Sequence, residues 1–180
     1  MTQLSIISIL VGTVIIGARL PGVIAPGKFR EFALKFPRSL IWGRALMGIV
    51  ALIVWWVMYH AATEEWAWAR PLIVAGVPVA YLMVWQYGTH FLAVRAVAAL
   101  MLLVAKQMVT AADWSESNLR LVVTVFAYVW VVTAIWITIA PHHLRDLLGW
   151  VMANDQRCRK ACMVGVAVGV MLVGLGVFAY

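Results

Sequence analysis

Six long apolar stretches restrict this chain to a membrane environment. They cover residues 4–25, 40–59, 66–86, 91–112, 119–140 and 162–180. Each has roughly the twenty residues that a helix needs to cross a hydrocarbon core of about 30 Å. Hydrophobic residues make up 65% of the sequence and charged residues 12%, which is more apolar surface than a soluble core of this size can bury. The sequence therefore predicts an all-α, polytopic membrane protein with six transmembrane helices.

Residues 24–56 are echoed, with no gap needed, by residues 139–171. Both copies begin with Ile-Ala-Pro and carry arginines at matching positions, which are Arg30 and Arg44 in the first copy and Arg145 and Arg159 in the second. Behind each proline lies an apolar face with i, i+3, i+4, i+7 spacing, formed by Phe29, Phe32, Ala33 and Phe36 and by Leu144, Leu147, Leu148 and Val151. This register predicts a parallel internal repeat, in which two membrane helices are joined by an interfacial amphipathic helix.

The repeat divides a single membrane domain, residues 1–180, into three parts. We expect a first hairpin over residues 1–60, a central helix pair over 61–115 and a second hairpin over 116–180. Pro26 and Pro141 are expected in the first turn of the two interfacial helices, where the missing N–H costs nothing. The first apolar stretch lacks a basic leader and an Ala-x-Ala pattern, so we expect a retained helix rather than a signal peptide.

Basic residues are distributed unequally between the two sides of the predicted spans. One side holds Arg19, Lys28, Arg30, Lys35, Arg38, Arg44, Arg95, Arg145, Arg157, Arg159 and Lys160, and the other holds Arg70, Lys106 and Arg120. Because basic loops remain cytoplasmic, this bias predicts a bacterial inner-membrane protein with both termini on the outer side. Lys28, Arg30, Arg44, Arg145 and Arg159 are expected among anionic lipid headgroups, and the net charge of +7 does not indicate nucleic acid binding.

Catalytic and metal-binding patterns are scarce. No predicted span contains Asp or Glu, and no nucleophile elbow, phosphate-binding loop or carboxylate pair is found, so we expect no enzyme. Arg95 and Lys106 are near enough to an interface to reach it by snorkelling. The spacing of His142, His143, Cys158 and Cys162 does not favour a zinc site. We expect no cofactor, although a single axial haem or pigment ligand at His60 or His90 stays open.

Ala161, just before the last apolar stretch, and Gly165 and Gly169 within it are four residues apart on one helix face, and Gly174 and Gly176 lie beyond them. Small residues about four apart let another helix approach closely, and lipid alone gives no reason for them. We therefore expect a helix-packing surface there, used either within the chain or with a partner.

Pro26, Phe29, Arg30, Pro37 and Arg44 follow a recognisable order: a proline, an aromatic and basic pair, a short amphipathic stretch, and an arginine that opens a glycine-rich helix. The second copy follows the order more loosely with Pro141, Leu144, Arg145, Asp155, Arg159 and Gly165. Each copy resembles a family of short bacterial two-helix inner-membrane proteins of unknown function. The resemblance implies architecture, carries no active site, and does not extend to the central pair.

These features favour a non-catalytic membrane subunit or scaffold in a larger inner-membrane complex, with lipid and other membrane subunits as partners. The alternative is a small transporter or channel, possibly dimeric. Its path would use the polar groups of the fifth stretch, which are Thr124, Tyr128, Thr133 and Thr138. A lipid-modifying enzyme ranks third, because no nucleophile and base pair is found.

Overall fold

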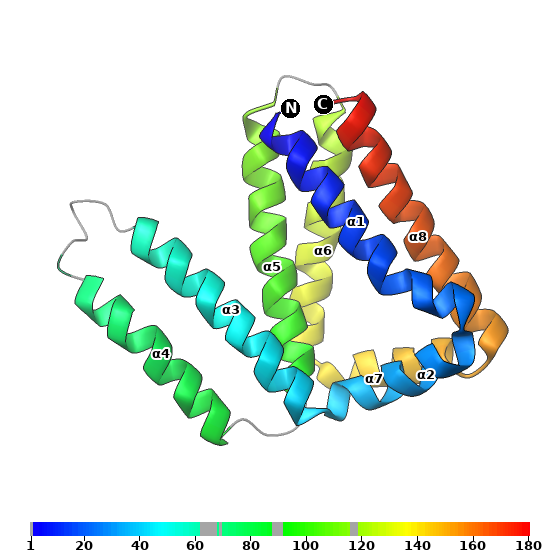
Figure 1. Cartoon of the computed structure of the whole chain (residues 1–180), viewed down its shortest axis with the longest axis horizontal. Helices are drawn as coiled ribbons and strands as arrows, with labels where there is room; N and C mark the ends of the chain where they lie inside the picture. Colours follow the sequence, from blue (N-terminus) through cyan, green and yellow to red (C-terminus); the bar gives the residue numbers. More distant parts are fainter. Residues whose placement is uncertain (1, 62–67, 69, 88–91, 116–118) are drawn as a thin grey trace.

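The computed structural model describes residues 2–61, 68, 70–87, 92–115 and 119–180, and within them the chain is helical and has no strand. Its elements are α1 (Gln3–Ile24), α2 (Pro26–Lys35), η1 (Phe36–Arg38), α3 (Leu40–Ala61), α4 (Arg70–Tyr87), α5 (Leu92–Asp113), α6 (Arg120–Ile139), α7 (Pro141–Val151) and α8 (Asp155–Phe178) (Figure 1). The all-α prediction is confirmed.

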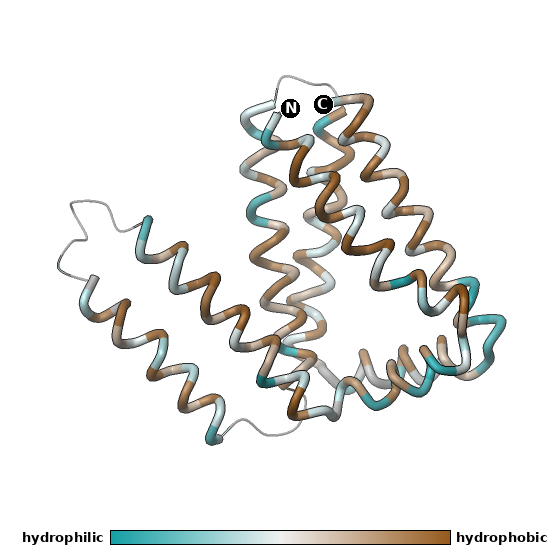
Figure 2. The backbone as a smooth tube through the Cα atoms, in the orientation of Figure 1, coloured by the Kyte–Doolittle hydropathy of each residue, from teal (hydrophilic) through white to brown (hydrophobic). Residues whose placement is uncertain are grey.

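Five of the described helices are long and apolar enough to cross a membrane, namely α1, α3, α5, α6 and α8. The described apolar part of α4, Val74–Tyr87, is shorter. Hydrophobic residues predominate along the long helices (Figure 2). On α6, for example, Leu121, Val125 and Ile139 are each more than half exposed. Such surfaces are matched by hydrocarbon rather than water, so the chain is a multi-pass membrane protein.

Two prolines open the short helices α2 and α7 as the sequence predicts. Ala25 has φ −132° and ψ 71°, Ala140 has φ −129° and ψ 71°, and Pro26 and Pro141 follow at the first helical turn. The non-helical conformation of the alanine stops the preceding long helix, and the fixed φ of proline starts the next one in a new direction. In Figure 1, α2 and α7 consequently run across the ends of the long helices. We call this end the interfacial end.

α1 and α8 are packed closely along their length. The Ser5 hydroxyl donates a hydrogen bond of 2.6 Å to the carbonyl of Gly176, and a Cβ added to Gly12 would lie 2.6 Å from the carbonyl oxygen of Gly169. A Cβ on Gly169 would in turn lie 2.9 Å from the carbonyl oxygen of Gly12. The two backbones can meet only because both positions lack a side chain.

The other end of the molecule brings both termini together, and we call it the termini end. Thr2 caps α1 by accepting a hydrogen bond from the backbone N–H of Ser5, and its hydroxyl donates to the carbonyl of Tyr180 at 3.2 Å. The Tyr180 hydroxyl donates to the carbonyl of Leu119, just before α6, at 2.6 Å. These bonds connect α1, the C-terminus and α6.

α5 and α6 form a second antiparallel pair, and the main core lies where this pair meets α1 and α8. Small and medium side chains interlock there without exposure: Ala105, Met108, Ala111 and Ala112 from α5, Val123 and Ala127 from α6, Leu4 and Val11 from α1, and Leu172 from α8. The core is nearer the termini end, because α1 and α8 lean away from α5 and α6 toward the interfacial end (Figure 1).

At the interfacial end, α2 and α7 lie against each other and against α8. Ala33 of α2, Met152 after α7, and Cys158 and Cys162 of α8 form a buried cluster there, with Phe29 and Leu148 packed on it. Part of the apolar face of each amphipathic helix is therefore packed against other helices of the chain. Phe32 and Leu147 on the same helices are 46% and 44% exposed, so part of each face stays open to lipid.

The two long helices of each repeat do not close into a hairpin on each other. α1 packs mainly on α8, and α6 packs mainly on α5. The reason is geometric, because the ten residues of α2 place about 15 Å of helix between the end of α1 and the start of α3. α7 separates α6 from α8 in the same way. Residues 24–56 and 139–171, the two predicted copies, thus share the same helix packing rather than folding separately.

α3 and α4 form the one pair that projects from the rest of the described structure (Figure 1). α3 approaches α5 closely at the interfacial end, where a Cβ on Gly43 would lie 2.9 Å from the backbone nitrogen of Ala93. From there α3 leans away, and α4 packs on α3 alone to any substantial extent. We call α3 and α4 the projecting hairpin.

The α1–α8 contact predicts a sharp difference between two glycines. Gly12→Leu must push the helices apart and should lower the free energy of unfolding by about 2 kcal/mol or more, as for severe overpacking. Gly174→Leu should change it by less than about 0.5 kcal/mol, because a Cβ there would meet nothing within 4 Å. Reversible unfolding in mixed micelles measures both values, and equal destabilisation would contradict the close contact.

Candidate functional site

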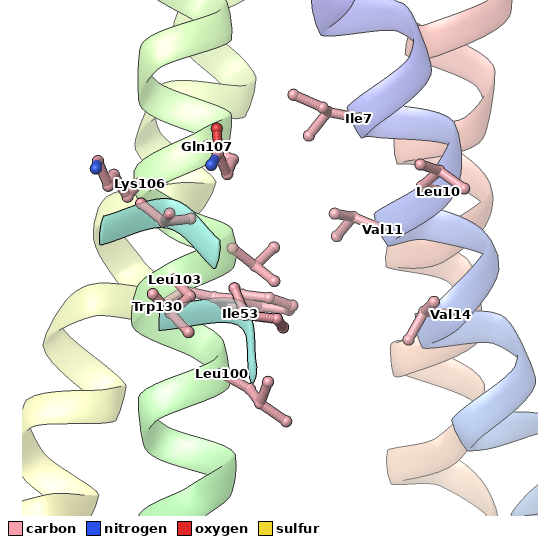
Figure 3. Close-up of a pocket in the computed structure, with 12 residues that line it drawn as sticks. Ile7, Leu10, Val11, Val14, Ile53, Leu100, Leu103, Lys106, Gln107 and Trp130 are labelled. Carbon is pink, nitrogen blue, oxygen red and sulfur yellow. The ribbon is translucent and has the colours of Figure 1, made fainter. Parts of the chain in front are cut away.

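A groove opens between α1 and α3, with α5 as its floor. It has a volume of about 350 Å³. Its lining consists of Ile7, Leu10, Val11 and Val14 from α1, Ile53 and Val57 from α3, Leu100, Leu103, Val104, Lys106 and Gln107 from α5, and Trp130 from α6 (Figure 3). We call this the α1–α3 groove. Apart from Lys106 and Gln107, all of these side chains are hydrocarbon or aromatic.

The groove follows from the way in which two helices meet α5 at opposite ends. α1 joins α5 at the termini end through the main core, whereas α3 joins α5 at the interfacial end, near Gly43 and Ala93. Each then leans away from α5, and α1 and α3 make at most marginal contact with each other. The middle of α5 is left uncovered between them, and Trp130 reaches this space from α6.

The polar groups of the groove lie on its side toward the termini end. In Figure 3, Lys106 and Gln107 lie beyond Leu103 and Leu100 along α5. Both side chains are exposed, and no ion pair joins Lys106 to a carboxylate of the described residues. Lys106 is seven residues before Asp113 at the end of α5, a distance of about 10 Å along the helix. It therefore places a cation at the edge of an apolar surface.

Arg44, one of the five predicted headgroup residues, fastens the projecting hairpin. Its Nη2 donates to the carbonyl of Trp85 at 3.2 Å, and its guanidinium carbon lies 4.7 Å from the centroid of the Trp85 ring. The Tyr81 hydroxyl donates to the carbonyl of Arg44 at 3.3 Å. A cation is favourable at this place, since Trp85 is in the last turn of α4 where helix carbonyls lack partners.

The other predicted headgroup residues lie around the interfacial end. Lys28 and Arg159 are exposed on α2 and α8, in agreement with a surface position. Arg30 pairs with Asp155 at 3.6 Å, and both side chains are about half exposed, so this ion pair contributes little to stability. The side chain of Arg145 lies outside the described residues.

The small residues of α8 divide into an inward and an outward set. Gly169 and Gly176 pack against α1, and the aliphatic part of Arg19 lies over Gly165, 2.9 Å from the position of an added Cβ. Ala161, one turn earlier, is half-buried. Gly174 faces open space. The structure thus uses Gly165 and Gly169 within the chain, and Gly174 is outside that contact.

The polar groups proposed for a transport path do not line the groove. The hydroxyls of Thr124, Thr133 and Thr138 each donate to a carbonyl one turn earlier on α6. Tyr128 is 58% exposed on the outside of the same helix. His60 Nδ1 lies 2.9 Å from the carbonyl oxygen of Trp56, and the two rings are in contact, with centroids 4.0 Å apart and planes tilted by 41°. His90, the other candidate axial ligand, lies outside the described residues.

Sequence reasoning missed the partner of the α8 glycines and the groove itself. Ser5, Ser8 and Gly12 form the matching small surface of α1, and their spacing was a usable signal. The groove had no such signal, because its lining comes from four helices and is chemically similar to a lipid-facing surface. No protein-family model matches the chain, and no match is found among curated proteins or solved structures.

The Arg44 contact predicts that the end of α4 depends on one side chain. Arg44→Gln should remove the cation–π contact and weaken the bond to Trp85, at a cost of about 1–2 kcal/mol. Local opening should then be about 5- to 30-fold more frequent, as measured by amide hydrogen exchange in residues 82–87. Lys35→Gln, which removes the charge of an exposed basic residue on α2, is the matched control. Unchanged exchange in the Arg44 variant would show that the contact does not hold α4.

Proposed function

We propose that the chain is a non-catalytic, multi-pass subunit or scaffold of a larger membrane complex, and that the projecting hairpin is its docking element. The observation that carries this proposal is the isolation of α4, which, among the described helices, packs substantially only on α3. Helices within a membrane associate through close packing rather than through a hydrophobic driving force. Most of the surface of the projecting hairpin is not packed against another helix of the described structure. This surface can therefore pack closely against a helix of another protein.

The outward face of α4 suits such a contact. Gly76 would accept a Cβ without meeting any atom within 4 Å, and Ala80, one turn later, is exposed. The partner we propose is a transmembrane helix of another subunit, whose ridge would lie over these two small residues. Arg44 and Tyr81 hold α4 against α3 from the opposite side, so the hairpin can present this face as one unit.

A small transporter finds less support as the alternative. The threonine hydroxyls of α6 are bonded to their own helix, and the floor of the α1–α3 groove is the closely packed pair α5 and α6. No described polar path leads from one end of the molecule to the other.

We further propose that α4 also crosses the membrane, which gives six spans in a bacterial inner membrane with both termini outside. The support is that α4 runs beside α3 and returns to the interfacial end, and its 18 residues extend about 27 Å. The parallel repeat remains part of the proposal. Its support is the matching conformation of Ala25 and Ala140 and the same helix order on either side. Descent from a tandem two-helix ancestor would account for both.

The docking proposal predicts different outcomes for three glycines that all face open space, Gly76 on α4, Gly17 on α1 and Gly174 on α8. Gly76→Leu should release partners at normal membrane levels of the protein, because leucine covers the small surface. Gly17→Leu and Gly174→Leu should retain them. Extraction with a mild detergent and quantitative mass spectrometry of co-migrating proteins measures this. A chain that runs alone in native membranes would refute the scaffold, and release only by Gly174→Leu would move docking to α8.

The orientation predicts which single cysteines an impermeant thiol reagent reaches from outside intact cells. Gln3→Cys and Asp113→Cys, at the termini end, should react, and Lys35→Cys and Asn154→Cys, at the interfacial end, should not. The unaltered chain is the control, because Cys158 and Cys162 are fully buried. The reversed pattern would overturn the orientation.

A further inference from the structure

We propose that the α1–α3 groove is a specific site for one anionic phospholipid, whose acyl chain lies in the groove and whose phosphate is bound by Lys106. This inference goes beyond the scaffold proposal, since it concerns a different surface and a ligand from the bilayer. It rests on the shape of the groove, on the position of the cation at its rim, and on the direct access of lipid to the space between α1 and α3.

The apolar lining of the groove suits a hydrocarbon ligand. The groove is walled by branched side chains of α1 and α3 on either side of α5, and Trp130 lies at its floor (Figure 3). Its volume of about 350 Å³ is within the range of small-molecule sites. Because α1 and α3 make at most marginal contact, a bilayer lipid can enter sideways without any movement of the helices.

Apolar packing alone would not select any lipid, because every acyl chain is as apolar as the side chains that line the groove. Selectivity for one lipid must therefore come from the polar side chains at the edge of the groove. Lys106 is the one cationic group in the lining, and no described carboxylate neutralises it. A charge inside the hydrocarbon region is costly unless it reaches water or a counter-ion. A lipid phosphate at the termini end supplies that counter-ion.

The distances along α5 fit this arrangement. Lys106 lies about 10 Å inside the end of the helix, so its flexible stem must extend toward the termini end to meet a headgroup. Gln107 is next to it on the lining and can donate to a phosphate or ester oxygen. The apolar lining continues on the other side, through Leu103 and Leu100, in the direction that an acyl chain takes from its headgroup toward the membrane centre.

The test is native mass spectrometry of the purified full chain in neutral detergent, titrated with phosphatidylglycerol, phosphatidylcholine or oleic acid. Phosphatidylglycerol should bind most tightly. Lys106→Gln should weaken this binding by about five-fold, the factor that corresponds to about 1 kcal/mol per basic residue, and Lys106→Arg should retain it. The matched control is Lys160→Gln, which removes an exposed lysine from α8 at the interfacial end.

A second pair of variants tests the groove separately from the charge. Val14→Trp fills the groove and should also reduce binding, whereas Val164→Trp, at a comparably exposed position on α8, should not. Equal losses in Lys106→Gln and Lys160→Gln would show only general attraction of anionic lipid and overturn the site. Preferential binding of oleic acid would overturn the phospholipid assignment. Binding unaffected by both Lys106→Gln and Val14→Trp would overturn the proposal, while partner release by Gly76→Leu would be unaffected.

Discussion

The close approach of α1 and α8 is the contact on which the rest of the arrangement depends. Lipid tails are as apolar as the helices, so two helices stay together only where their surfaces fit closely. Gly12 and Gly169 allow backbone contact, and the Ser5 hydroxyl adds a buried hydrogen bond to the same seam. Because α1 begins the chain and α8 ends it, this single seam also brings the termini together and fixes the position of α2 and α7 at the other end.

The interfacial helices α2 and α7 determine where the other long helices lie relative to the contact between α1 and α8. A tight turn after α1 would have placed α3 directly beside it. Instead, Ala25 ends α1, Pro26 redirects the chain, and α2 carries it across to α5 before α3 begins. α7 does the same between α6 and α8, and the buried cluster of Ala33, Met152, Cys158 and Cys162 holds both short helices against α8. The length of α2 keeps α1 and α3 apart, and the groove is the space between them.

Sequence patterns predict the local structure of this chain far better than its packing. The prolines at 26 and 141, the amphipathic faces behind them and the long apolar runs all have a period or a residue type with a direct physical meaning. The helices after both prolines and five of the six apolar runs were found, although α8 begins at Asp155 rather than at residue 162. Which helix lies beside which has no such signature. Glycines at 165 and 169 predicted a close contact, yet only the structure identifies α1 as the partner. The contact of Arg44 with the last turn of α4 likewise had no signature in the sequence.

The free-energy cost of leaving the faces of the projecting hairpin unpacked is much lower in a membrane than in water. In water, the uncovered faces of α3 and α4 would drive collapse onto the remainder of the chain. In hydrocarbon they cost little, so the hairpin can stand apart while its position is determined by a few contacts near Gly43 and by Arg44. A lipid held between α1 and α3 would occupy the space that the hairpin leaves and would oppose its closure onto α1. The environment that lets the hairpin project is thus also the one that can fill the space between α1 and α3.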